Sequence, residues 1–457
     1  MRILTTLAVI LLFLFGCRKD DQISTDPALK LEFSADSILF DTVFTSIGST
    51  TQKLKVYNRS KQAIKISEIK LAGGSASNYQ ININGIPGIN ASDIELRGND
   101  SLNIFVRVTI NPNSNTLPFV VSDLLEFLTN GNSQKVILNA YGQNAVFLKD
   151  AVINTNLTWT KNLPYVIYGP VTIATGRTLT IEKGSRIYFH KNAEMVVGGT
   201  LKVDGTPQDS VLFSSDRLER IYEDERGQWK GVRFLSSSIN NHINYTLIRN
   251  GIIGLQVDSM SRNSNPKLLL TNTKVLNMEL MGLYGINADI TGFNNIIANC
   301  GKYLIYGING GSYNLKQNTF TNSIAQIRTN PSVLFTDGMN AQTSAKLNIT
   351  LVNNIIWGNL SNEFSVEKIG SLPIVQDIHN NLIKSGSTSF SGNGNILNQN
   401  PLFKNERENL FTLLSESPAS NKGADLNLDP YFNTWLSKDL NGRSRLFPSD
   451  LGSYEIF

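Results

Sequence analysis

One short stretch of the chain concentrates the side chains that could bind a ligand. Residues 214–228 hold five acids and three arginines, and Trp229 follows directly. A tyrosine and a tryptophan can stack on the apolar face of a sugar, while neighbouring carboxylates can accept hydroxyl hydrogen bonds or hold Ca²⁺. The ligand-binding residues predicted here are Tyr222, Glu223, Asp224 and Trp229. The alternative is a solvated loop whose charges pair with one another.

Residues for catalysis are harder to find. A glycoside hydrolase needs two carboxylates a few ångströms apart, and the only Asp-Asp pair is Asp20-Asp21. The polygalacturonase set of Asn-x-Asp, Asp-Asp and Gly-His-Gly is missing as a set, and the Arg-x-Pro-x-x-Arg pattern of pectate lyases is absent. His190, His242 and His379 lack metal-ligand spacing, so we expect them to be structural. Apart from Ca²⁺ at the loop, no cofactor is expected.

A cysteine near the N-terminus indicates lipid attachment. An apolar run from Ile3 to Phe15 is too short to span a bilayer as a helix. It ends in Leu14-Phe15-Gly16-Cys17, which resembles the lipobox of bacterial lipoproteins. The resemblance implies cleavage before Cys17 and acylation of that residue. An ordinary secretory signal with a chance cysteine is the alternative.

The segment after Cys17 bears on location. Arg18-Lys19-Asp20-Asp21 resembles the tag that sends some lipoproteins to the outer face of the outer membrane. We therefore expect a signal peptide at 1–16, a tether at 17–28, and a lipid-anchored protein of the outer membrane that faces the exterior. Since lipidation uses Cys17, Cys300 is left alone, without an intramolecular disulfide, and is expected to be a buried, inert thiol.

Composition favours a β-rich extracellular protein. Only 17% of the residues are charged, the net charge is +4, and no stripe of Lys and Arg stands out. Nucleic acid is therefore not an expected partner. From 29 to 145 the chain alternates polar and apolar residues between turn signals, which predicts a β-sandwich. This segment resembles the immunoglobulin-like modules of bacterial surface proteins, without a Cys–Trp–Cys pattern.

Short apolar triplets then recur and predict a parallel β-helix over residues 150–400. The triplets that begin at Val171, Leu179 and Ile187 are followed by triplets 24, 22 and 24 residues later. Three short strands in a turn of about 23 residues is a solenoid pattern, and the chirality of parallel crossovers makes it right-handed. An asparagine ladder at one corner is expected to hydrogen-bond along the axis. Its predicted members are Asn272, Asn295, Asn318, Asn354 and Asn381.

The period stops near Asn400. Asp439-Leu-Asn-Gly-Arg443 and Asp450-Leu-Gly-Ser-Tyr-Glu455 resemble the C-terminal motifs of the choice-of-anchor Q family of bacterial surface β-helix proteins, with Ser453 where alanine is usual. The predicted role of residues 401–457 is to cap the solenoid and cover its exposed strand edge.

The sequence thus predicts an all-β surface lipoprotein that binds a polysaccharide or a surface protein without catalysis. A polysaccharide lyase or hydrolase with an unrecognised site is the first alternative, and a structural or adhesive stalk is the second. Fold alone does not decide among the three.

Overall fold

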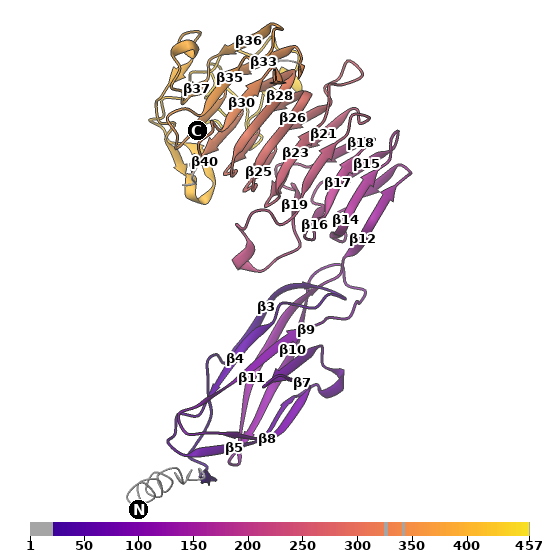
Figure 1. Ribbon diagram of the computed structural model, residues 1–457, viewed down its shortest axis with the longest axis vertical. Helices are drawn as coiled ribbons and strands as arrows, with labels where there is room; N and C mark the ends of the chain where they lie inside the picture. The colour runs from indigo at the N-terminus through magenta and orange to yellow at the C-terminus, as the bar shows by residue number, and fades with distance from the viewer. Residues whose placement is uncertain (1–21, 324–327, 341–342, 457) are drawn as a thin grey trace, which may run out of the picture. The chain divides into compact units, whose positions relative to one another are not determined.

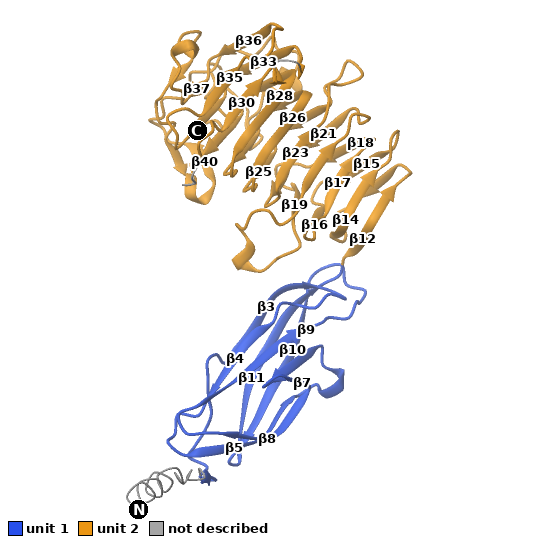
Figure 2. Cartoon of the chain, in the orientation of Figure 1, with its two compact units in different colours: residues 1–144 blue, residues 145–457 orange. Residues whose placement is uncertain are grey.

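The computed structural model describes residues 22–323, 328–340 and 343–456, and Cys17 lies outside this range. The expectation of an all-β chain is confirmed (Figure 1). The chain divides between Asn144 and Ala145 into two compact units, which Figure 2 colours separately.

The N-terminal unit contains two sheets that share one apolar core. The first sheet contains β1 (Ile23–Ser24), β3 (Ser37–Phe44), β5 (Ala63–Leu71), β8 (Asn90–Leu96), β10 (Phe119–Thr129) and β11 (Asn132–Gln143). The second contains β2 (Glu32–Phe33), β4 (Gln52–Tyr57), β6 (Tyr79–Ile83), β7 (Ile86–Gly88) and β9 (Ser101–Val108). Strand β9 illustrates how the sequence builds this core: Leu102, Ile104 and Val106 alternate with less buried residues and point into it.

The second unit is built on a sheet of 25 strands across the described residues, and every pairing between them that is recorded is parallel. Its strands are β12 (Val146–Ile153), β13 (Leu157–Trp159), β14 (Tyr165–Ile173), β15 (Thr178–Glu182), β16 (Arg186–Phe189), β17 (Glu194–Val197), β18 (Thr200–Asp204), β19 (Val211–Ser215), β20 (Gly231–Phe234), β21 (Asn241–Asn244), β22 (Thr246–Arg249), β23 (Ile253–Val257), β24 (Leu268–Thr271), β25 (Lys274–Leu276), β26 (Met281–Phe293), β27 (Ile296–Ala298), β28 (Tyr303–Lys316), β29 (Thr319–Asn322), β30 (Val333–Thr336), β33 (Leu347–Val352), β34 (Ile355–Gly358), β35 (Phe364–Glu367), β36 (Ile374–His379), β37 (Leu382–Ile383) and β38 (Ile396–Leu397). We call this sheet the parallel stack.

From β14 to β23, each strand of the parallel stack pairs with the strand three places later, which fits a parallel β-helix. Register-matched apolar side chains form inward columns, such as Val171, Met195, Val232 and Leu255, all buried. Two of the three predicted triplet offsets match the register. The third is wrong by two residues, because the longer turn at 205–210 makes Ile187 pair with Phe213.

A column of asparagines runs along one corner of the parallel stack. The Oδ1 of Asn318 accepts from the backbone N–H of Asn295, and the Oδ1 of Asn354 accepts from that of Asn318, each at 2.9 Å. Asn381 makes the same contact with Asn354, and Asn395, which the sequence spacing did not single out, makes it with Asn381. The column satisfies corner N–H groups that strand pairing leaves over.

Asn272 does not belong to this column, and its predicted register is wrong by one residue. Thr273 occupies the position, with its N–H donating to Asn295 Oδ1 at 2.9 Å. Asn272 has a left-handed backbone with φ of 50°, a conformation that recurs at Asn294 and Asn353 in the preceding position of later corners. Asparagine tolerates that conformation as well as the ladder position, so residue type alone cannot separate the two.

Residues after Pro401 lie along the side of the parallel stack, which corrects their predicted role as an end cap. Outward-facing Ile296, Ile355 and Leu382 are covered by a cluster that includes Phe403 and Leu451. The elements of this tail are β39 (Phe403–Asn405), β40 (Leu410–Leu413), the 3₁₀ turn η4 (Glu406–Glu408) and the π-helical turn η5 (Phe432–Leu436). The strands that carry Ile296, Ile355 and Leu382 are apolar on both faces, so their outer face needs this cover.

The remaining elements are short. The hairpin strands β31 (Gly338–Asn340) and β32 (Thr343–Ser344) lie after β30, and η1 (Gly74–Ala76), η2 (Arg220–Tyr222) and η3 (Thr388–Phe390) are single 3₁₀ turns. In η3, the Phe390 ring packs against Phe364 with ring centroids 4.7 Å apart. The segment around η3 therefore lies against the core at the last turns of the stack. Within the described residues no helix is long and apolar enough to cross a membrane.

Candidate functional site

The charged loop between β19 and β20 is fastened to the parallel stack by its own backbone. The N–H of Gln228 donates to Asn250 O at 2.9 Å, and the N–H of Gly227 donates to Gly251 O. The Asn250 Nδ2 in turn donates to Glu223 O at 2.7 Å. The loop is thus held as a ridge beside rigid strands, which is where binding sites are commonly built.

Trp229 does not line this site, contrary to its predicted role in sugar stacking. Its side chain is fully buried, and its ring stacks on Phe189 with centroids 4.0 Å apart. The indole Nε1–H donates to Arg249 O at 2.9 Å. Trp229 forms a bridge with Gly251 at the start of a rung and its side chain enters the core. It is therefore a packing residue.

The other three predicted binding residues are engaged by neighbours. The Arg217 guanidinium lies 3.8 Å from the Tyr222 ring centroid and covers one face of the ring. Glu223 lies 3.6 Å from Arg249, and Asp224 Oδ1 accepts from Asn277 Nδ2 at 3.1 Å. The alternative of charges paired within the loop holds for Arg217 and Glu219, at 3.2 Å, whereas Glu223 and Asp224 contact residues of the stack. In the described part of the chain, no three His, Cys, Asp or Glu side chains gather as a metal site.

A cleft of about 370 Å³ opens beside this loop. It is lined by His190, Lys191, Ser215, Asp216, Arg217, Tyr222, Glu225, Arg226, Gly227 and Gln228. The volume is within the range of about 300–1,000 Å³ that small-ligand sites occupy. We call it the loop cleft.

An aligned column of side chains contributes His190 and Asp216 to the lining of the loop cleft. Ile167, Phe189 and Ser215 are register partners in three successive rungs, so Tyr168, His190 and Asp216, one residue later, follow one another along the axis. The His190 Nδ1 lies 2.7 Å from Asp216 Oδ2, and the His190 ring lies 4.5 Å from the Tyr168 ring. Burial raises the pKa of Asp216, although its hydrogen bond to His190 acts in the opposite direction. The same burial raises the pKa of Tyr168 to about 12.

Arg226 is a cation of the loop cleft that has no carboxylate partner among the described residues. It is partly buried, and burial lowers the pKa of its guanidinium. No described side chain makes an ion pair or hydrogen bond with it, whereas Arg217 is paired with Glu219 at 3.2 Å. Arg226 also lines a neighbouring cavity of about 450 Å³ that contains Glu279 and Arg407.

From the sequence, His190 is expected to be structural and Arg226 does not stand out. The repeat of the rungs could have identified His190. His190 directly follows β16 and Asp216 directly follows β19, and these two strands are paired in adjacent turns. His242 and His379 are different. His242 is half-buried against Trp435, with a pKa lowered by burial, and His379 lies 3.7 Å from Asp377 at the far end of the stack. Cys300 is fully buried, and burial raises the pKa of its thiol to about 12.

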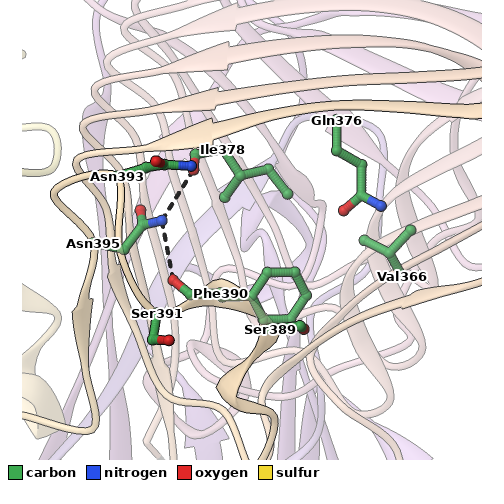
Figure 3. A pocket seen from close by; sticks show the side chains of 8 residues that line it. All are labelled: Val366, Gln376, Ile378, Ser389, Phe390, Ser391, Asn393 and Asn395. Carbon is green, nitrogen blue, oxygen red and sulfur yellow. Dashed lines mark hydrogen bonds between the residues drawn. The ribbon is translucent and has the colours of Figure 1, made fainter.

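Two other cavities have less to offer chemically. Figure 3 shows one of about 250 Å³ at the last turns, where Asn395 Nδ2 is already bonded to Ile378 O and Phe390 O. The other, about 430 Å³, lies on the outer face of the second sheet of the N-terminal unit beside Phe105 and Arg107. Neither places a histidine or a carboxylate among its lining residues.

Comparisons with known proteins give little. No family model matches the chain, and no curated protein matches its sequence. Among solved structures, the ASH/PapD-like domain of human CEP192 matches with 13% identity and a TM-score of 0.19, covering 27% of this chain and 92% of that chain. The E. coli chaperone DraB matches with 10% identity and a TM-score of 0.18, covering 25% of this chain and 56% of that one. A protein of unknown function from Porphyromonas gingivalis W83 has 12% identity and a TM-score of 0.18, with coverages of 28% and 60%. At these TM-scores the likenesses carry no argument about this chain.

Proposed function

We propose that this protein is a surface lipoprotein that binds an acidic glycan in the loop cleft. The observation that carries the proposal is the partly buried guanidinium of Arg226, which has no carboxylate partner among the described residues. A guanidinium of this kind is stabilised most by an anionic ligand, because charge-assisted, bidentate hydrogen bonds to the anion replace the hydrogen bonds to water that burial removed. Lys191 lines the same cleft and adds a second positive charge to it.

The test compares acidic with neutral glycans on the purified full chain in detergent. We expect uronate oligosaccharides to bind by calorimetry and neutral oligosaccharides to bind at least tenfold more weakly. Arg226→Gln should weaken uronate binding by tenfold or more, since about 1.4 kcal/mol corresponds to a factor of ten. Arg220→Gln, an exposed arginine of the same loop, is the matched control and should have no effect. Equal affinity of the Arg226 variant and the unaltered protein would move the site elsewhere.

The location proposal rests on Cys17 and the apolar run before it. Acylation of Cys17 would hold the chain in the outer membrane, and the tag-like segment that follows favours the outer face. Cys17→Ala should abolish metabolic labelling with fatty acid. Labelling that survives this change contradicts the assignment.

We also propose the finer fold assignments, a right-handed β-helix for the parallel stack and an immunoglobulin-like sandwich for residues 29–145. The handedness is supported by the chirality of parallel crossovers, and the sandwich by two sheets around one core. The structural use of the C-terminal motifs supports a relation to the choice-of-anchor Q family. For example, Asp439 Oδ1 accepts from the Arg443 N–H at 2.8 Å and holds the turn of the first motif.

A further inference from the structure

We propose that the loop cleft also cleaves the uronate glycan that it binds, by β-elimination with His190 as the base. This inference rests on the proposed function, because it requires a uronate in the cleft. It goes further by naming a reaction and the residues that perform it. It also replaces the expectation from sequence that all three histidines are structural.

His190 has the surroundings of a positioned base. Its Nδ1 bonds to a carboxylate that is itself held, since the side chain of Asp216 is only 9% exposed and its N–H donates to Phe189 O at 3.1 Å. Tyr168 packs against the ring from the neighbouring rung. The imidazole is 46% exposed and lines the cleft, so its Nε2 is the nitrogen left for a substrate. A base oriented by a buried carboxylate is the arrangement found in many proton-transfer sites.

The reaction follows from the groups in the cleft. A proton on the carbon next to a carboxylate becomes removable when a cation neutralises that carboxylate, and Arg226 is the available cation. His190 Nε2 takes the C5 proton, the electron pair forms a C4=C5 double bond, and the C4–O4 bond breaks. The leaving O4 takes a proton from the hydroxyl of Tyr222, whose ring lies against the Arg217 guanidinium. Water then carries the proton from the imidazolium back to Tyr222, so no oxidant, reductant or metal is consumed.

The products are a new reducing end and a 4,5-unsaturated uronate with a conjugated ultraviolet absorbance. We would incubate the full chain in detergent with polygalacturonate and, separately, with alginate, and follow that absorbance together with binding. A steady rise in absorbance with at least one polymer is the expected result. Binding without absorbance on both polymers overturns the elimination and leaves the proposed function standing. Absence of binding to both overturns the two together.

Variants locate the chemistry. His190→Gln should reduce the rate by about 100-fold or more, the usual size of general-base catalysis, while uronate binding, which also reports a folded cleft, changes less than threefold. His379→Gln, a partly exposed histidine beside Asp377 at the other end of the stack, is the matched control and should retain full activity. A His190→Gln protein as active as the control overturns the assignment of the base.

Asp216 is assigned as a positioning residue, and the pH profile tests this role. Tyr168 packs on the His190 ring, and the other titratable and charged groups of the cleft are Lys191, Asp216, Arg217, Tyr222, Glu225 and Arg226. In Asp216→Asn the imidazolium loses its carboxylate partner, so the acidic limb of the pH–rate profile should move to lower pH and kcat should fall more than KM changes. A uniform loss of activity at every pH, with an unmoved profile, would mean that Asp216 has only a structural role and would overturn the assignment.

Discussion

Trp229 and His190 show how burial decides the role of a residue. A tryptophan beside a charged loop has the chemistry of a sugar-binding platform, yet Trp229 is stacked on Phe189 inside the core. A lone histidine is commonly structural, yet His190 is half exposed, paired with Asp216 and part of a cleft wall. In both cases the deciding fact is the direction in which the side chain points from its rung. That direction alternates with every residue of a strand, so an uncertainty of one position exchanges inside and outside.

Replacing Trp229 should therefore affect stability far more than binding. Trp229→Ala removes a large, fully buried ring and leaves a cavity, which costs about 3–5 kcal/mol. Ile221→Ala is the matched control, because Ile221 lies in the same loop with 76% of its surface exposed, and it should stay within about 0.5 kcal/mol. Urea unfolding measures both variants. If they prove equally stable, the packing role given to Trp229 is wrong.

At the scale of elements, the parallel stack was predictable where local pattern determines register. Val171 and Met195, or Leu179 and Leu201, pair as the triplet spacing indicates, because inward apolar columns tolerate no slip. The register of Ile187 was predicted wrongly because the local pattern does not reveal the extra residues in the turn that follows. That of Asn272 was predicted wrongly because two adjacent corner positions both accept asparagine. The loop cleft was beyond local prediction, because it requires knowing that His190, Asp216 and Arg226, far apart in the sequence or on different elements, line one cleft.

The asparagine ladder makes a prediction about the corner that it runs along. The Asn318 side chain takes part in five hydrogen bonds there, two with Asn295 and one each with Gly292, Lys316 and Asn354, and none of its surface is exposed. Asn318→Ala should cost about 3 kcal/mol or more, because it leaves several buried polar groups unpaired. Asn318→Thr should cost less, since Thr273 already serves at the equivalent position. Thermal unfolding of the two variants checks the order, and an alanine variant as stable as the threonine one contradicts it.

The C-terminal tail should make stability depend on pH through Glu455. This carboxylate is bonded to Arg445, with Asp439 and Asp450 nearby, and burial raises its pKa from 4.5 to about 7. Because this pKa is raised, protonation of Glu455 favours the folded state. Its contribution to the free energy of unfolding is complete below pH 4.5 and is lost as the pH rises through 7. We expect Glu455→Gln, which carries no titrating charge, to gain on the unaltered protein by about 1–2 kcal/mol between pH 5 and pH 8. The exposed Glu416→Gln should show no such trend in unfolding measured across this range.

At the scale of the whole molecule, the two units have separate cores. The apolar cluster of the N-terminal unit extends from Leu31 to Ala140, and the main cluster of the parallel stack extends from Ile153 to Ile383. No described residue belongs to both clusters. Each unit therefore buries enough apolar surface by itself to be a domain of ordinary size, and the site proposed here depends on the second unit alone.

Separate cores predict separate unfolding transitions. All four tryptophans, Trp159, Trp229, Trp357 and Trp435, belong to the second unit, so tryptophan fluorescence follows that unit while circular dichroism follows both. Ile104→Ala, in the N-terminal core, should lower the free energy of unfolding of that unit by about 2–5 kcal/mol. Its unfolding transition, which circular dichroism detects and tryptophan fluorescence does not, should shift down by roughly 10 °C. Trp229→Ala should lower only the transition that the remaining tryptophans report. Each variant is the other's control, and one transition that both of them shift would mean that the units unfold as a single cooperative body.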